Sequence, residues 1–377
     1  MAEISRKLAG STCGQRFGSL VGLGLILVFF LSGCMTQILA TRLVTAPNRE
    51  GVPELFGNPK NLAAADSFYM QVWRLPVGPP AAELAVGVID PADYHLIYDT
   101  NCQRDAKDGT VSFNFKCNWS LSRVERTQMI STEPPKATLV LLHGFMMTKE
   151  SMQPWAFYFA QKGYRVVLID LRGHGRSTGK WIGYGAWEAD DLVLVTNELV
   201  RRGLLIGKLG VFGQSYGAAV GIHWAARDPR VATVVALAPF SDPLTAIPKF
   251  ARGFNPKLAA KVSDATFGKA EARAAKLAGF AWGDLNVVNA MERVRVPVLL
   301  FHGADDSWIL PEHTEALERV APAGSRREVT PLDNHLSLMV RLDIVGPSAL
   351  AWFDERLRAD VPILATPVAE PVASMTK

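Results

Sequence analysis

Three residues far apart in the sequence, Ser215, Asp306 and His335, are of the types that carry out nucleophilic catalysis. Ser215 stands in the stretch VFGQSYGAA, where Gly213 and Gly217 complete a Gly-x-Ser-x-Gly pattern. A serine hydroxyl is a weak nucleophile near neutral pH, so it needs an adjacent base that a third group orients. The pattern fixes only three positions and arises by chance in about one chain of this length in ten. The elements around Ser215 must therefore decide whether it is a nucleophile or an ordinary turn residue.

The residues on either side of Ser215 predict a strand, a sharp turn and a helix. The strand-like KLGVFG precedes the serine, and the helical YGAAVGIHWAA follows it. A nucleophile is presented on such a turn when its neighbours lack side chains, which Gly213 and Gly217 do. This setting favours Ser215 as a nucleophile.

Five apolar runs rich in Val and Leu predict the scaffold that holds this turn. They read ATLVLLHG, YRVVLID, LGVFG, VATVVALAP and VPVLLFHG, and helix-length segments lie between them. Continuous apolar runs are typical of strands buried on both faces, as in a parallel sheet. We therefore expect an α/β fold with a doubly wound, mostly parallel sheet, whose ligands bind at the carboxyl ends of the strands.

Two histidines follow the candidate acids and could serve as the base. His313 lies in PEHTEALERV, which predicts an outer helix and a surface position, whereas His335 lies in TPLDNHLSL, just after the strand-like RREVT. His335 is therefore the preferred base. The run LLFHGADDSW ends a buried strand with two candidate acids, Asp305 and Asp306, and Asp333 is a weaker alternative.

Two of these motifs resemble those of the α/β-hydrolase superfamily. A His-Gly-x-x-Asp sequence after this strand is similar to the acid motif of that fold, which implies Asp306 as the acid. The chain order Ser215, Asp306, His335 is also the order of that fold. LLHGFMM resembles its oxyanion loop, which implies that the backbone N–H groups of Phe145 and Tyr216 hold the developing oxyanion.

The stretch DLRGHGRSTG, residues 170–179, resembles a loop of the serine aminopeptidase, monoacylglycerol lipase and esterase-like branch of the superfamily. In that branch the loop is structural, which implies that Asp170, Arg172 and His174 brace the oxyanion side. The resemblance covers about residues 138–357 and implies a serine hydrolase that forms an acyl-enzyme without a metal or organic cofactor. It favours a small-molecule or lipid ester as substrate. A serine peptidase and a non-catalytic binding scaffold remain alternatives.

The N-terminus predicts export and lipid anchoring. A basic stretch precedes the apolar run 17–31, which is short for a spanning helix and typical of a signal peptide over residues 1–33. LSGC resembles the lipobox of bacterial lipoproteins, which implies cleavage before Cys34 and its acylation, with an uncleaved signal anchor as the alternative. Met35 follows Cys34, so the Asp that retains lipoproteins in the inner membrane of enteric bacteria is absent from this position. We therefore expect a periplasm-facing protein at the bacterial outer membrane rather than the inner one.

The rest of the chain divides by its pattern. We expect a tether over 34–53, a strand-rich part with antiparallel edge strands over 54–135, a catalytic core over 136–360 with a helical cap insertion at about 241–289, and a disordered tail over 361–377. The formal net charge of +4 is spread along the chain, which gives no indication of nucleic-acid binding. The oligomeric state is left open.

Two cysteines remain outside the signal region. Cys102 and Cys117 bracket a short loop, and in an oxidising compartment we expect them to form a disulfide, with two buried free thiols as the alternative.

Overall fold

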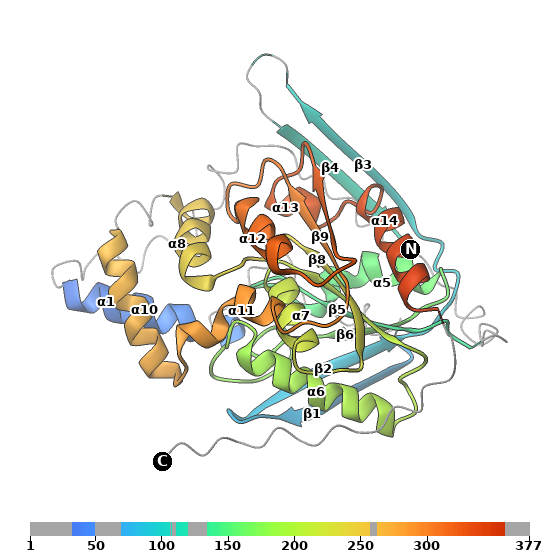
Figure 1. Ribbon diagram of the computed structural model, residues 1–377, viewed down its shortest axis with the longest axis horizontal. Helices are drawn as coiled ribbons and strands as arrows, with labels where there is room; N and C mark the ends of the chain where they lie inside the picture. The colour runs from blue at the N-terminus through green and yellow to red at the C-terminus, as the bar shows by residue number, and fades with distance from the viewer. Residues whose placement is uncertain are drawn as a thin grey trace.

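The computed structural model describes residues 32–49, 69–105, 107, 111–119, 134–256 and 262–358. Its central feature is an eight-stranded sheet in the order β1-β2-β6-β5-β7-β8-β9-β10 (Figure 1). The strands from β5 to β10 pair in parallel, whereas β2 runs antiparallel to β6 and β1 antiparallel to β2. This confirms the predicted mostly parallel α/β sheet with antiparallel edge strands. The strands are β1 (Gln71–Val77), β2 (Ala82–Ile89), β5 (Thr138–Leu142), β6 (Arg165–Ile169), β7 (Leu209–Gln214), β8 (Val231–Leu237), β9 (Val298–Gly303) and β10 (Arg326–Thr330).

Helices cover both faces of this sheet, which explains the continuous apolar strands. Along β5, Val140 and Leu142 belong to one core cluster, and Leu139 and Leu141 belong to the other, because successive side chains point to opposite faces. Every residue of β5, β6, β7 and β9 is buried. One face packs on α6 (Ala186–Arg201), α7 (Tyr216–Ala225) and α12 (Glu312–Val320), and the other on α5 (Gln153–Ala160) and α14 (Val345–Arg356).

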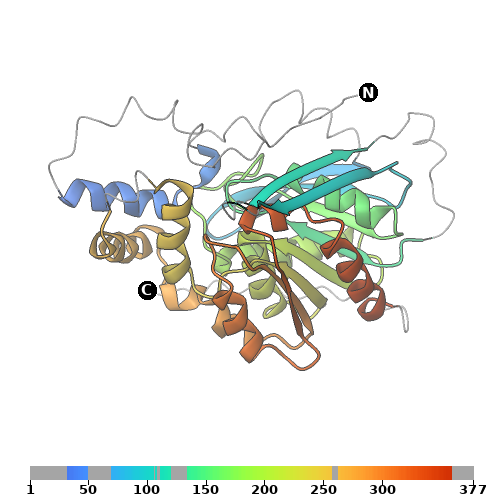
Figure 2. The ribbon, with the colours of Figure 1, turned by 90° about the horizontal axis from the view of Figure 1, so that it is seen from above.

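A helical insertion between β8 and β9 forms the predicted cap. It comprises α8 (Pro243–Phe254), α10 (Asp264–Ala278), η3 (Trp282–Leu285) and α11 (Val287–Met291). Figures 1 and 2 show α8 and α10 to one side of the sheet, with α1 (Ser32–Val44) beside α10.

The predicted tether over 34–53 is wrong for its described part, residues 34–49. These residues form most of α1 and the short helix η1 (Pro47–Arg49), and Thr45 bridges to Trp181. Ala40, Leu43 and Val44 lie three and four positions apart, so they share one helix face, and they are buried with Ala270 and Ala274 of α10. The segment is folded because this apolar stripe has a partner in the cap. Cys34 lies in the first turn of α1.

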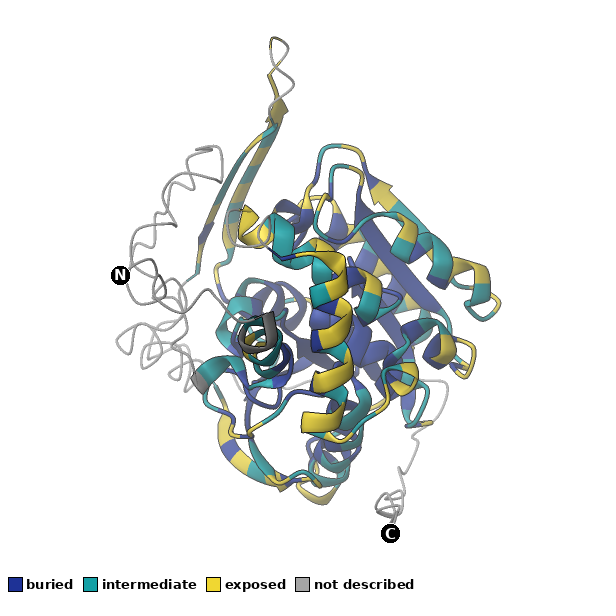
Figure 3. Ribbon diagram, turned by 90° about the vertical axis from the view of Figure 1, so that its left-hand side faces the viewer, coloured by how far each residue is buried: buried dark blue, intermediate teal, exposed yellow. Residues whose placement is uncertain are grey.

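Strands β3 (Ile97–Arg104) and β4 (Val111–Asn118) form a separate two-stranded hairpin that extends away from the body (Figure 3). Both strands lie in the predicted strand-rich part over 54–135, but they do not join the central sheet.

The predicted disulfide between Cys102 and Cys117 is wrong, and both thiols are free. The register of the hairpin places Cys102 opposite Phe113 and Cys117 opposite Tyr98. Four residues of extended strand, about 13 Å, therefore separate the two levels. A disulfide requires Cα atoms within about 7 Å, so this register does not allow the bond.

Two further predictions fall mainly outside the described residues. These are the signal peptide, except for Ser32 and Gly33 at the start of α1, and the tail over 361–377. In the part of the chain that the structure describes, no helix has both the length and the apolarity to cross a membrane.

Candidate active site

Ser215 occupies a strained turn between β7 and α7, at the carboxyl end of a parallel strand. Its backbone has φ +51° and ψ −111°, a positive φ that a residue with a side chain rarely adopts. A Cβ at Gly213 would lie 2.5 Å from the carbonyl oxygen of Gly217, and one at Gly217 would lie 2.4 Å from that of Leu142. Backbone therefore fills the space that a side chain would need on either side of Ser215.

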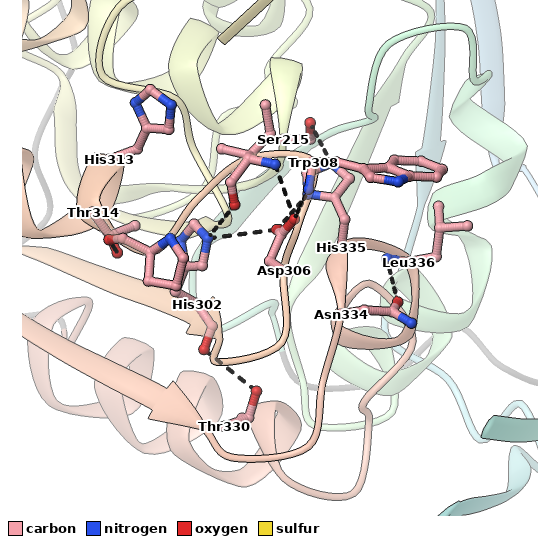
Figure 4. Close-up of polar contacts among 12 residues, drawn as sticks. Ser215, His302, Asp306, Trp308, His313, Thr314, Thr330, Asn334, His335 and Leu336 are labelled. Atoms are coloured by element: carbon pink, nitrogen blue, oxygen red, sulfur yellow. Dashed lines mark hydrogen bonds and ion pairs between the residues drawn. The ribbon is translucent and has the colours of Figure 1, made fainter. Parts of the chain in front are cut away.

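His335 is the first residue of the short helix α13 (His335–Leu338), close to Ser215 (Figure 4). Its Nε2 lies 2.9 Å from Ser215 Oγ, and its Nδ1 lies 2.7 Å from Asp306 Oδ2. Asn334 caps the helix, since its Oδ1 accepts from the N–H groups of Leu336 and Ser337. These two hydrogen bonds of Asn334 fix the start of α13, and with it the backbone position from which the imidazole projects.

Asp306 is buried in the loop after β9, and both of its carboxylate oxygens accept hydrogen bonds. Oδ1 accepts from the backbone N–H groups of Trp308 and Ile309, at 3.0 and 2.9 Å. Burial by itself raises the pKa of Asp306, but hydrogen bonds from His302, His335 and the Ile309 N–H together hold that pKa well below its ordinary value. An ionised Asp306 favours the His335 tautomer with its proton on Nδ1, which leaves Nε2 to accept from the Ser215 hydroxyl.

His302, a buried histidine of β9, is a site residue that the sequence motifs did not predict. Its Nε2–H donates to the carbonyl oxygen of Ile309 at 2.8 Å and lies 3.5 Å from Asp306 Oδ2. Both contacts fix the loop that carries Asp306. Its sequence signal is the His-Gly pair that ends the run VPVLLFHG, and it was missed because only histidines after the acid were considered.

The two alternative acids, Asp305 and Asp333, form ion pairs with other residues. Asp305 pairs with Arg104 of the β3–β4 hairpin. Asp333 is buried, and its Oδ1 and Oδ2 accept from Arg341 Nη1 at 2.9 and 2.8 Å. Its Oδ1 also accepts from Ser337 Oγ at 2.9 Å. Neither carboxylate pairs with His335 among the described residues.

His313 is not the surface residue that was predicted. It is half-buried in α12, and its Nδ1 lies 2.8 Å from Ser241 Oγ and accepts from the Ser241 N–H at 3.2 Å. The chain thus contains a second serine–histidine contact beside the Ser215–His335 pair.

The two residues predicted to supply oxyanion donors flank Ser215. A Cβ on Gly144, which precedes Phe145, would lie 3.8 Å from the Ser215 Cβ, and Tyr216 follows the serine at the start of α7. Within the described parts of the chain, the backbone N–H groups of Phe145 and Tyr216 have no acceptor. Both are therefore free to donate to an oxygen bound next to Ser215.

The loop over residues 170–179 packs behind these donors. Asp170 accepts from the Lys149 N–H at 2.7 Å, and Arg172 makes a two-point ion pair with Asp191 at 2.9 and 2.6 Å. The buried His174 ring lies 5.8 Å from that of Phe145 and 5.5 Å from that of Tyr216, between ring centroids. Burial and the neighbouring His143 lower the pKa of His174 to about 3, so it is neutral and contributes packing.

His143, which the sequence analysis did not assign, links the two loops. Its Nε2 accepts from the Leu171 N–H at 3.0 Å, so its Nδ1–H donates to the Gly144 carbonyl at 2.8 Å. Burial lowers the pKa of His143 to about 4. The oxyanion loop is thereby tied to the start of the 170–179 loop.

The described residues contain no group of three or more His, Cys, Asp or Glu side chains placed to hold a metal ion.

Comparison with known proteins adds to this geometry. Residues 133–278 match the family model described as serine aminopeptidase, S33. The protein YqkD of Bacillus subtilis (strain 168) is 26% identical over 195 residues, which are 48% of this chain and 58% of YqkD, so the match spans little more than half of that relative. The bifunctional esterase/perhydrolase DCH of Acinetobacter calcoaceticus is 27% identical over 211 residues, 44% of this chain and 73% of that protein.

A solved structure, an esterase of Pyrococcus furiosus, has the same fold. It aligns with a TM-score of 0.52 and 20% identity, over 81% of this chain and 98% of the esterase. The protein thus has the α/β-hydrolase fold. Over residues 133–278 it is similar to the serine aminopeptidase, S33, family.

Proposed function

We propose that this protein is a serine hydrolase that cleaves carboxylic esters, of small molecules or of lipids, through a covalent acyl-enzyme. The observation that supports this most is the unbroken series of short contacts from Ser215 through His335 to the buried Asp306. The esterase activity in the name of the Acinetobacter relative agrees with the proposal.

The first half-reaction forms the acyl-enzyme. His335 Nε2 takes the hydroxyl proton as Ser215 Oγ attacks the ester carbonyl carbon, and Asp306 stabilises the imidazolium. The carbonyl oxygen becomes negative and accepts from the N–H groups of Phe145 and Tyr216. The carbon–oxygen bond to the leaving alcohol then breaks, and His335 Nε2–H gives its proton to the leaving oxygen.

The second half-reaction releases the acid. A water molecule gives a proton to His335 as its oxygen attacks the acyl carbon. The same N–H groups stabilise the second oxyanion. The bond to Ser215 Oγ breaks and the serine regains its proton from His335, so the enzyme returns to its starting state.

A second candidate is a peptidase, because the matched family model is that of a serine aminopeptidase. Esters and aminoacyl anilides, assayed side by side, separate the two. Turnover of the esters without turnover of the anilides supports the esterase, and turnover of the anilides supports the peptidase, because a serine peptidase also cleaves activated esters.

Labelling with a fluorophosphonate probe tests whether Ser215 is a nucleophile. We expect purified wild-type protein to be labelled, and Ser215→Ala and His335→Ala to lose the label. Ser241→Ala is the matched control, because Ser241 also contacts a histidine, His313. Loss of labelling in Ser241→Ala but not in Ser215→Ala would move the nucleophile to the other pair. A folded wild-type protein without label would favour the non-catalytic scaffold.

The proposal places the protein at the bacterial envelope, facing the periplasm at the outer membrane, through acylation of Cys34. Incorporation of radiolabelled palmitate tests this, with Cys34→Ser expected to lose the label. Cys13→Ser is the control, since Cys13 lies in the segment that cleavage removes. Equal labelling of both variants would contradict the anchor at Cys34.

A further inference from the structure

Four aromatic rings lie around the Ser215–His335 pair, and they come from three separate parts of the chain. Phe145 belongs to the oxyanion loop, Phe250 and Phe254 to cap helix α8, and Trp308 to the loop that carries Asp306. None of the four is buried, and Phe254 is 52% exposed. Partly exposed aromatic rings beside a reactive centre are typical of the walls of a binding site.

Phe250 connects the two sides of this centre. Its ring centroid lies 6.1 Å from that of Phe145, 6.4 Å from that of His335 and 5.6 Å from that of Trp308. These separations fall in the range of direct ring contacts. The cap therefore touches both the oxyanion loop and the base through one side chain.

A glycine sets how closely α8 approaches the loop. A Cβ on Gly253 would lie 2.3 Å from Cδ1 of Trp308 and 2.7 Å from its Nε1. The helix backbone thus rests directly on the indole, one turn beyond Phe250. Phe254 stacks on Phe250 with centroids 5.8 Å apart and also contacts Trp308 at 6.1 Å. The contact at Gly253 holds Phe250 in its position over the site.

Two charged residues near these rings in the sequence are paired elsewhere, and Lys249, next to Phe250, is exposed to solvent. Arg252 pairs with Asp264 of α10 and lies over the Phe267 ring, and Asp305 pairs with Arg104. The rings consequently offer an apolar surface to a substrate.

The chemistry of the reaction decides which part of an ester meets this surface. The leaving oxygen must come within proton-transfer reach of His335 Nε2, so the leaving group lies against the side chains that line His335. Trp308 and Phe250 line that imidazole, at 5.9 and 6.4 Å between ring centroids. Resting on the proposed esterase function, we propose that Phe250 is a specificity-determining residue that selects esters of apolar alcohols, with Gly253 holding it in place.

Isomeric esters test the side of the carbonyl on which the apolar group binds. Hexyl acetate and ethyl hexanoate have the same composition and differ only in which side carries the long chain. Each buried methylene is worth about threefold to fourfold in kcat/KM. We expect wild-type protein to prefer hexyl acetate to ethyl acetate by about tenfold or more, and to prefer hexyl acetate to its isomer.

Four variants test the residues. Phe250→Ala is expected to lose most of the preference for hexyl acetate over ethyl acetate, while Phe250→Leu keeps part of it. Gly253→Ala, which must displace α8 from Trp308, is expected to lose it as well. Gly268→Ala is the matched control, because a Cβ on this glycine of α10 meets nothing within 4 Å, and it should keep the wild-type preference.

The rate of fluorophosphonate labelling separates failure of this inference from failure of the proposed function. A labelled wild-type protein whose preference is unchanged in Phe250→Ala and Gly253→Ala overturns the role of Phe250. A labelled protein that prefers ethyl hexanoate overturns the assignment to the leaving-group side. A wild-type protein that is folded and not labelled overturns the proposed function, and this inference with it.

Discussion

Asp306 Oδ2 lies 2.7 Å from His335 Nδ1, whereas Asp305, the adjacent residue, pairs with Arg104 of the β3–β4 hairpin. Two neighbouring carboxylates thus have separate partners in the structure. The difference arises from the turn after β9, which buries Asp306 and leaves the Asp305 side chain 33% exposed.

Replacing the two aspartates one at a time tests this division. We expect Asp306→Asn to lower kcat about 10³-fold to 10⁴-fold, because the amide no longer favours the Nδ1–H tautomer or stabilises the imidazolium. Asp305→Asn is the matched control and should retain kcat/KM near the wild-type value, since exposed ion pairs contribute little. Steady-state kinetics on a p-nitrophenyl ester measures both. An equal loss in the two variants would contradict the assignment of Asp306.

The glycines of the turn give a prediction for stability. Gly217→Ala places a Cβ 2.4 Å from the Leu142 carbonyl oxygen, so backbone must move, and we expect a loss of about 3 kcal/mol or more in the free energy of unfolding. Gly221→Ala, in the same helix, meets side chains and no backbone, with Val211 at 3.0 Å and Leu142 and Val234 at 3.7 Å, and should stay within about 1 kcal/mol of wild type. Urea denaturation measures both, and equal stabilities would show that the turn tolerates a side chain.

Sequence periodicity and local pattern predicted the central sheet, the turn at Ser215 and the cap, because each depends on residues close together in the chain. The features that it did not predict depend on partners far away. Helix α1 is folded because Ala270 and Ala274 of α10 cover its apolar stripe. The position of Phe250 between the oxyanion loop and His335 likewise depends on contacts with distant segments.

The hairpin register shows a different limit of sequence reasoning. Cys102 and Cys117 were paired because they bracket one loop, but a strand pairing is set by the turn, and a shift along the strand moves every partner. The choice of Asp306 over Asp305 similarly came from a family motif, because both residues satisfy the spacing that chemistry requires.

The free cysteines give a chemical prediction. Burial raises the pKa of Cys117 to about 12, and burial with neighbouring carboxylates raises that of Cys102. Because the thiolate is the reactive form, we expect both to react slowly with iodoacetamide in the folded protein. After denaturation without reductant, peptide mass spectrometry should find both residues alkylated. A linked peptide pair would show instead that the hairpin adopts another register.

Three buried histidines predict how stability depends on pH. Burial is the main cause that lowers the pKa of His143 to about 4 and the pKa values of His174 and His223 to about 3. In the unfolded chain a histidine has a pKa of about 6.5. Between about pH 6.5 and pH 4 these three histidines therefore bind more protons in the unfolded chain than in the folded protein, and their contribution to the free energy of unfolding falls as pH falls. Asp306 has a lowered pKa, so its contribution to the free energy of unfolding is lost only at more acidic pH, as the pH falls below the ordinary pKa of an aspartate.

Replacing one histidine isolates this effect from other groups that titrate. Asp191, for example, has its pKa raised to about 7 by burial and works in the opposite direction, but it is common to both proteins compared. From pH 7 to pH 5.5, we expect the free energy of unfolding of wild type to fall by about 1 kcal/mol more than that of His223→Gln, because glutamine takes up no proton. Urea denaturation at the two pH values measures this difference. If both proteins lose the same free energy, then His223 takes up a proton as readily in the folded protein as in the unfolded chain, and burial does not keep it neutral.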